Sequence, residues 1–350
     1  MRKVRIGFVG TGFMGQLAHL SNYAVLDDDC EVVAIAEPRR ELARQVARRY
    51  GVEKVYANHL ELLENCEVDA IVAAQPYAHH LTILPDIIQA GKAVFTEKPL
   101  ALSVEAGEKL VRLSKEKGVL HMVGYHKRSD PAMEYAHRLI QEWKSSGAYG
   151  KMKLVRITMP PGDWMGGAPK CIRSNEPYPS ITTEAMPDYF DEETGRLYDA
   201  FVNYYIHQVN AMRFLMGEPY RVAYADPSGI LMVAEGETGV CGVLEMAPYQ
   251  TSMDWQETML VAFERGYVRV DLPAPLASQQ AGRVTLMQDK GTGYPVIMQP
   301  VMPPISAMRQ QAKNFIAAIK GEREAPCTAE EALEDLRIAR DYIRMYRARA

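Results

Sequence analysis

The chain has 350 residues, of which 47% are hydrophobic and 24% are charged, and its net charge at pH 7 is −4. This composition is typical of a globular protein with two domains, and the charge excludes the basic surface of a nucleic-acid-binding protein. No apolar run is long enough to span a bilayer, and the 5 cysteines show no C-x-x-C spacing. We therefore expect a cytoplasmic protein with free thiols, no membrane segment and no metal site.

The first predicted element is a buried parallel strand over residues 4–9, which runs directly into a glycine-rich turn. Gly10, Gly12 and Gly15 have the spacing G-x-G-x-x-G. In this pattern the first glycine permits a tight turn, the second lets the backbone approach a pyrophosphate, and the third lets the next helix pack on the strand. The predicted dinucleotide loop consists of Gly10, Thr11, Gly12, Phe13, Met14 and Gly15.

A second strand, over residues 31–36, ends at Glu37. An acidic side chain at this position can accept hydrogen bonds from the adenosine ribose and would repel a 2′-phosphate. Arg39 and Arg40 follow closely, and a guanidinium could instead accommodate that phosphate. We predict NAD as the cofactor and regard NADP as the less favoured alternative.

Strands and helices then alternate, which predicts a parallel sheet with right-handed crossovers. Gln75 and Pro76 end the predicted strand over residues 70–74, and His79 and His80 follow. We interpret this histidine pair as a capping or packing feature and not as a metal site. Lys98 follows the predicted strand over residues 93–96 and precedes a proline, so it is presented rigidly at a strand's carboxyl end. The remaining predicted elements of this part are helices over residues 16–25, 39–50, 81–90 and 103–118, a short helix after residue 58, and a strand over residues 119–124.

The pattern changes after residue 130. Several short β-type runs follow one another, which predicts an antiparallel sheet. The long irregular stretch over residues 160–191 contains Asp163, Trp164 and Tyr178. These side chains could form one wall of a sugar site or could only pack the loop. We predict helices over residues 132–145, 197–216, 306–320 and 329–347, and strands over residues 151–159, 231–234, 240–246, 259–263, 267–271 and 284–287.

The glycine loop, the Gln75-Pro76…His80 segment and the Glu97-Lys98-Pro99 motif together resemble the glucose–fructose oxidoreductase/inositol dehydrogenase family. The segment from His207 to Gly217 is similar to a helix of that family's second domain. The resemblance implies an α/β protein with an N-terminal Rossmann dinucleotide-binding domain at residues 1–125. It further implies a C-terminal α/β domain at residues 126–350 that binds substrate through an open, mostly antiparallel sheet, with its last helices able to pack back on the first domain.

By the same resemblance, Lys98 and His207 are the catalytic pair. A histidine has an ordinary pKa near 6.5, which suits a general base, and a lysine cation can stabilise a developing alkoxide. Asn203 stands one helical turn before His207, where the family usually has an aspartate, and an amide can still orient a substrate. The resemblance assigns cofactor contacts to Gln75, Pro76, His80, Glu97, Lys98 and His126. It assigns substrate contacts to Lys98, Tyr125, Arg128, Asp163, Trp164, Asn203 and His207.

The implied activity is NAD-dependent oxidation of a secondary hydroxyl of a sugar, glycoside or cyclic polyol. The aromatic insertion favours a bulky pyranoside oxidised at C3. One alternative is a glycosidase or epimerase that recycles its NAD, and another is a sugar- or nucleotide-sensing module without catalysis. The family's sheet implies a homodimer or homotetramer, and neither a nucleic acid nor a membrane is an expected partner.

Overall fold

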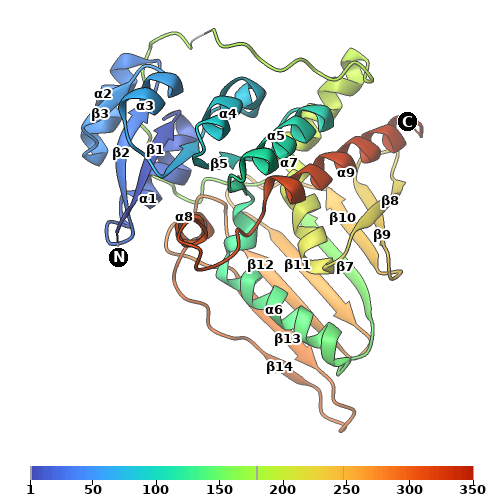
Figure 1. Ribbon diagram of the computed structural model, residues 1–350. Helices are drawn as coiled ribbons and strands as arrows, with labels where there is room; N and C mark the ends of the chain where they lie inside the picture. Colours follow the sequence, from blue (N-terminus) through green and yellow to red (C-terminus); the bar gives the residue numbers. More distant parts are fainter. Residues whose placement is uncertain (1, 179, 247, 350) are drawn as a thin grey trace. The chain divides into compact units, whose positions relative to one another are not determined.

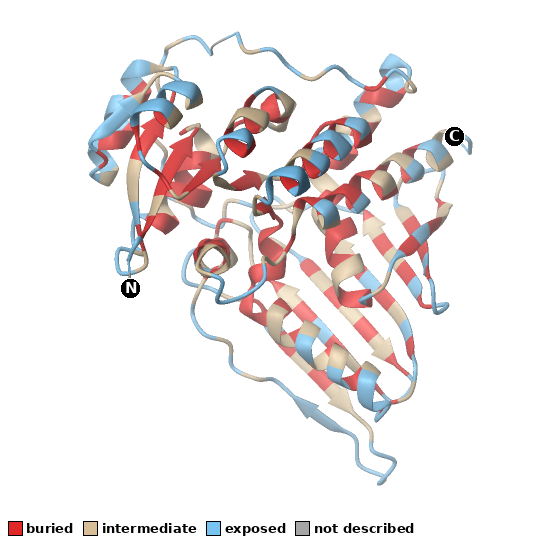
Figure 2. Ribbon diagram, in the orientation of Figure 1, coloured by how far each residue is buried: buried red, intermediate tan, exposed pale blue. Residues whose placement is uncertain are grey.

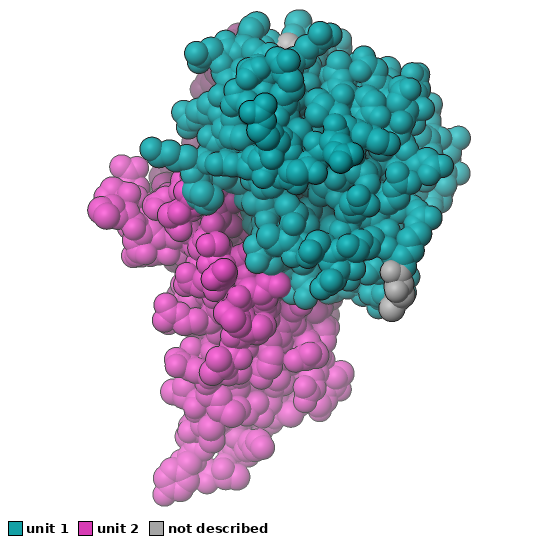
Figure 3. Space-filling model, turned by 90° about the vertical axis from the view of Figure 1, so that its left-hand side faces the viewer, with its two compact units in different colours: residues 1–125, 169–191, 308–336 teal, residues 126–168, 192–307, 337–350 magenta. Residues whose placement is uncertain are grey.

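The computed structural model describes residues 2–178, 180–246 and 248–349, and these form two compact units. Unit 1 comprises residues 1–125, 169–191 and 308–336, and unit 2 comprises residues 126–168, 192–307 and 337–350 (Figure 3). Part of the long irregular stretch therefore belongs to unit 1, although both of its neighbours in the chain belong to unit 2. The helix that ends the chain is shared between the two units.

Unit 1 is built on a parallel sheet of six strands in the order β3-β2-β1-β4-β5-β6 (Figure 1). The apolar runs predicted as buried strands form its centre, and every residue of β4 is buried. The parallel Rossmann-type sheet predicted from the sequence is thus confirmed. The short edge strand β3 was not predicted, because its three residues show no apolar pattern. The strands are β1 (Val4–Val9), β2 (Cys30–Ala36), β3 (Lys54–Tyr56), β4 (Ala70–Ala73), β5 (Ala93–Glu97) and β6 (His121–Gly124).

Helices connect these strands and bury one face each, as the red and pale-blue faces in Figure 2 show. The Ser103 hydroxyl caps α5 by accepting a hydrogen bond from the Ala106 N–H, and Gly118 ends the helix with a φ of +60°. Phe315 of α8 packs its ring 5.7 Å from that of Phe95 in the core. The helical segments are η1 (Gly15–Leu20), α1 (Ser21–Tyr23), α2 (Arg40–Tyr50), α3 (His59–Asn65), η2 (Tyr77–His79), α4 (His80–Gln89), α5 (Val104–Lys117), α8 (Ala307–Ile319) and α9 (Ala329–Arg347).

Unit 2 contains an eight-stranded sheet in the order β14-β13-β12-β11-β7-β10-β9-β8. All neighbouring strands are antiparallel except β7 and β10, which run parallel, so the expected mostly antiparallel sheet is confirmed. The chain leaves β7 through a long connection that includes α7, and such a connection can re-enter a sheet in the same direction. The strands are β7 (Met152–Met159), β8 (Tyr220–Ala225), β9 (Leu231–Gly236), β10 (Cys241–Met246), β11 (Glu257–Phe263), β12 (Gly266–Leu272), β13 (Arg283–Gln288) and β14 (Val296–Met298).

The helices α6 (Pro131–Ser146) and α7 (Glu192–Met216) of unit 2 pack on its sheet. Burial alternates strictly along β11, so every second side chain lies in the core. The strands β8 and β14 were not predicted, and all three residues of β14 are exposed. Helix α7 begins five residues before its predicted start. Within the described part of the chain, no helix is both long and apolar enough to cross a membrane.

Candidate active site

The glycine loop has the geometry that its spacing predicts. Gly10 has a φ of +86°, and its N–H donates to the carbonyl oxygen of Ala36 at the end of β2. A Cβ atom on Gly15 would lie 2.4 Å from the Gly10 carbonyl oxygen, so only glycine fits there. A Cβ on Gly12 would meet only the Arg39 guanidinium, at 3.5 Å, which leaves open space beside the Gly12 backbone. Phe13 and Met14 lie half-buried at the start of the following helix.

Glu37 is buried at the end of β2, and both of its carboxylate oxygens accept hydrogen bonds. The Arg39 Nε and Nη2 atoms donate to them at 2.7 and 3.0 Å, and the Thr11 N–H donates at 3.0 Å. The guanidinium that the sequence offered as a partner for a 2′-phosphate is therefore neutralised by Glu37. This pairing supports NAD over NADP.

Gln75 and His80 lie in the segment that follows β4. Both polar atoms of the buried Gln75 side chain have no hydrogen-bond partner among the described residues. The His80 Nδ1–H donates to the carbonyl oxygen of Leu100 at 2.9 Å. Burial lowers the pKa of His80 to about 4, so its ring is neutral near pH 7. His80 thereby supports the loop that carries Lys98, while Gln75 has polar atoms to offer a ligand.

Lys98 is half-buried and follows the carboxyl end of β5, next to a cis peptide bond with Pro99. Its neighbour Glu97 accepts a hydrogen bond from His19 Nε2 at 2.6 Å and one from the Lys98 backbone N–H at 3.2 Å. Burial raises the pKa of the Glu97 carboxyl, but the hydrogen bond and charge of His19 and the charge of Lys98 outweigh it and hold that pKa below its usual value. Glu97 therefore remains ionised and fixes the backbone that presents Lys98.

The predicted residues of unit 2 gather on α7 and on the short helical turn η3 (His126–Ser129). Asn203 is exposed and His207 is half-buried, and they lie one turn apart on α7. The rings of His126 and His207 meet edge to face, with centroids 4.6 Å apart. His126, to which the resemblance assigned a cofactor contact, is thus a direct neighbour of the candidate base.

Sequence reasoning missed a buried ion pair beside these histidines. The Lys127 ammonium donates to Glu257 Oε2 at 2.5 Å, and both side chains are almost fully buried. Gln208 Nε2 and Trp255 Nε1 donate to the same carboxylate at 2.7 and 3.3 Å. Lys127 and Gln208 directly follow His126 and His207. One signal was available in the sequence, because Glu257 occupies an inward-facing position of the alternating β11 pattern.

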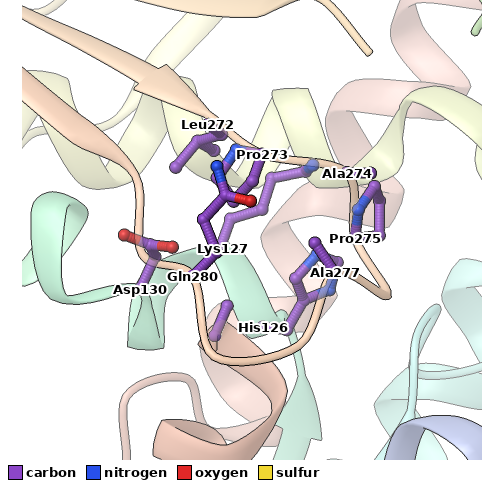
Figure 4. Close-up of a pocket in the computed structure, with 10 residues that line it drawn as sticks. His126, Lys127, Asp130, Leu272, Pro273, Ala274, Pro275, Ala277 and Gln280 are labelled. Atoms are coloured by element: carbon purple, nitrogen blue, oxygen red, sulfur yellow. The ribbon is translucent and has the colours of Figure 1, made fainter. Parts of the chain in front are cut away.

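A small pocket in unit 2 borders this pair (Figure 4). His126, Lys127 and Asp130 line one part of it, and the end of β12, the loop that follows and Ala307 line the rest. The Asp130 carboxylate caps α6 by accepting from the Ala132 N–H and also accepts from the Gly282 N–H. Burial raises the pKa of Asp130 to about 6.

The other predicted substrate residues have diverse surroundings. Arg128 is buried, with its Nε donating to Asn210 Oδ1 at 2.7 Å and its guanidinium 4.9 Å from the centre of the Phe214 ring. Tyr125 is buried after β6, at the end of the first segment of unit 1. Asp163 lines a hollow of unit 2 together with Tyr249, Met253, Trp255 and Arg269, among other residues, and Trp164 is partly exposed nearby in the chain. Tyr178 does not join them, because it lies in unit 1 beside Arg39.

The residues of unit 1 fit a bound dinucleotide. The open space at Gly12, the unpartnered amide of Gln75 and the carboxylate of Glu37 all follow carboxyl ends of parallel strands, where doubly wound sheets bind their ligands. Among the described residues, no group of three or more His, Cys, Asp or Glu side chains could hold a metal ion.

Comparison with known proteins gives the same assignment for the first domain. Residues 4–125 match the model of an oxidoreductase family described as having an NAD-binding Rossmann fold. Myo-inositol 2-dehydrogenase of Thermotoga maritima is 28% identical over 244 residues, which cover 70% of this chain and 63% of that protein. The scyllo-inositol 2-dehydrogenase (NAD(+)) of Bacillus subtilis is 27% identical over 259 residues, which cover 69% of this chain and 67% of that protein.

The fold is also that of solved structures. A levoglucosan dehydrogenase in complex with NADH and levoglucosan superposes with a TM-score of 0.74 over 100% of this chain and 98% of that one. The sequence identity between the two is 18%, so this likeness concerns the fold alone.

Proposed function

We propose that this chain, whose residues 4–125 match the model of an oxidoreductase family with an NAD-binding Rossmann fold, is an NAD-dependent dehydrogenase acting on a secondary hydroxyl of a sugar, glycoside or cyclic polyol. The observation that carries the proposal is the edge of the unit 1 sheet. There, a glycine loop with open space at Gly12 and a buried Glu37 follow two strands, and Lys98 follows a third. The inositol dehydrogenases to which the chain is similar act on hydroxyl-bearing rings of this kind.

In the proposed reaction NAD supplies the hydride acceptor when it is bound. The Lys98 ammonium donates a hydrogen bond to the substrate hydroxyl oxygen and stabilises the charge that develops there. His207 accepts the hydroxyl proton at a ring nitrogen, and the exposed Asn203 amide orients a neighbouring hydroxyl. The edge-on ring of His126 restricts how His207 can turn. We propose that residues 1–125 form the domain that binds the cofactor and that residues 126–350 form the domain that binds the substrate.

For the substrate we propose a glycoside, oxidised at C3 of a pyranoside ring. The hollow of unit 2 that contains Asp163 supports this class, because Tyr249 and Trp255 offer aromatic faces to a sugar ring and the carboxylate can accept from its hydroxyls. We also propose a homodimer or homotetramer formed through the unit 2 sheet, on which Leu260 and Tyr267 line a shallow surface depression. Light scattering of the purified protein would measure this state.

The test is a spectrophotometric assay with NAD and then NADP against pools of sugars, polyols and glycosides. Stoichiometric formation of reduced cofactor is the expected result. Lys98→Ala should abolish turnover and leave NAD binding intact, and Lys117→Ala, at an exposed position in the last turn of α5, should leave both unchanged. Retained turnover in Lys98→Ala would refute the role of this side chain.

A further inference from the structure

The irregular residues 169–178 and 180–191, here called the crossing segment, contain no helix or strand (Figure 1). They nevertheless contact the rest of unit 1 at many points. The Gln16 side-chain amide, which is fully buried, donates to the Ile172 carbonyl at 3.0 Å and accepts from the Ile172 N–H at 2.8 Å. The Glu176 carboxylate accepts from the backbone N–H groups of Glu41 and Leu42 at the start of α2. The first half of the segment is therefore fixed beside the helices that follow β1 and β2.

The second half of the crossing segment is fixed in the same way. The carbonyl oxygen of Thr182 accepts from His79 Nδ1 at 3.3 Å and from the Thr82 hydroxyl at 3.0 Å. The Glu184 N–H donates to the Ala78 carbonyl at 2.7 Å, and its carboxylate accepts from the Ser103 hydroxyl at 2.5 Å. These partners follow β4 and β5. Because parallel strands end at one edge of a sheet, the segment crosses the carboxyl edge of the unit 1 sheet, where the dinucleotide is expected.

Tyr178 lies at the centre of the crossing segment. The Arg39 guanidinium lies over its ring, 5.0 Å from the centroid, and Arg39 is itself held by Glu37. The His79 ring is nearly parallel to that of Tyr178, at an angle of 17° and a centroid distance of 6.4 Å. Tyr178 as a whole remains 52% exposed. Flat faces that gather beside the ribose-binding carboxylate are the surfaces on which a purine stacks.

We propose that Tyr178 binds the adenine of the dinucleotide and that the crossing segment forms the outer wall of the adenosine site. The inference rests on the proposed function. It adds a cofactor-binding residue that lies outside residues 1–125, the proposed cofactor domain. A dinucleotide held between the sheet edge and this segment leaves only when the segment's contacts open. We therefore expect the cofactor to be released slowly.

The experiment measures release of NADH in stopped flow, by displacing bound NADH with excess NAD and following its fluorescence. A base–aromatic contact is worth about 1–3 kcal/mol, so Tyr178→Ala should release NADH about 5- to 150-fold faster than the unsubstituted protein. Tyr178→Phe retains the ring and should change the rate less than about threefold. Tyr294→Ala replaces an exposed tyrosine of unit 2 and should leave the rate unchanged.

A second measurement uses only the unsubstituted protein, so its result does not depend on whether a variant folds. Arg173 is exposed in the crossing segment, and NAD should slow its cleavage by trypsin. Two results would overturn the inference: cleavage at Arg173 that NAD does not slow, or release of NADH from Tyr178→Ala at the rate of the unsubstituted protein. If the protein still binds NAD, the proposed function is not affected by either result. Tighter NADH binding by Tyr178→Ala would also overturn the inference, because the phenol would then compete with adenine. Failure of the unsubstituted protein to bind NAD or NADH at all would instead refute the proposed function.

Discussion

Replacing Lys127 with methionine should destabilise unit 2 by about 3–5 kcal/mol, because it leaves a buried carboxylate without its cation. Glu257 is 1% exposed, and of the three donors that its carboxylate has among the described residues only the Lys127 ammonium is charged. Methionine keeps the length and apolar character of the lysine stem, so the cost reflects the charge and not a cavity. For a protein with a total stability of about 5–15 kcal/mol, this is a large loss.

The ion pair can be separated from general damage by a double-mutant cycle. Glu257→Gln leaves the buried Lys127 ammonium without its paired carboxylate and should also be costly. The double variant, Lys127→Met with Glu257→Gln, removes both charges and leaves an amide oxygen to accept from Gln208. We expect its cost to be smaller than the sum of the single costs by about 2 kcal/mol or more.

Urea unfolding followed by tryptophan fluorescence suits this cycle. The 3 tryptophans, Trp143, Trp164 and Trp255, all belong to unit 2, so fluorescence reports the unfolding of that unit. Lys153→Met is the matched control, since its ion pair with Glu264 is exposed and should contribute less than about 1 kcal/mol. Additive costs in the cycle, or a loss below about 1 kcal/mol in Lys127→Met, would refute the reasoning.

The remaining predictions concern substitutions at single positions. Gly15→Ala would place a Cβ 2.4 Å from a carbonyl oxygen and should lower the free energy of unfolding of unit 1 by about 1–3 kcal/mol or more. Gly12→Ala should keep the fold, as circular dichroism would show, and weaken NAD binding, as calorimetric titration would show. Ser103→Ala removes the α5 cap and should cost about 1 kcal/mol in urea unfolding. Burial raises the pKa of Asp130 to about 6, above its unfolded value, so its protonation stabilises the folded state fully below about pH 4 and this contribution is lost as the pH rises through about 6. In Asp130→Asn the urea midpoint should depend less on pH between about 4 and 6, while the asparagine amide still caps α6. If the substitution leaves the pH dependence of the midpoint unchanged, Asp130 does not titrate in that range.

The sequence by itself determined the local structure of unit 1. Apolar runs that alternate with amphipathic helices predict a parallel sheet, because burial on both faces requires such runs. The need for glycine at positions 10 and 15 follows from the local geometry of a tight turn between a strand and a helix. The rigid position of Lys98 after β5 likewise follows from its immediate neighbours in the chain. Residue patterns of this kind depend on neighbours close in the chain, and they could be found without coordinates.

Only the tertiary structure decided which distant residues meet. The parallel pairing of β7 and β10, the buried contact of Lys127 with Glu257 and the attachment of Tyr178 to unit 1 each join residues far apart in the chain. The aromatic insertion, for which the sequence left open a wall of a sugar site or mere packing of the loop, is divided, with Asp163 in unit 2 and Tyr178 beside Arg39. The sequence around a charged residue in a strand, or around a tyrosine in a loop, does not identify the residue that it will contact. Long-range packing and desolvation select that partner when the chain folds.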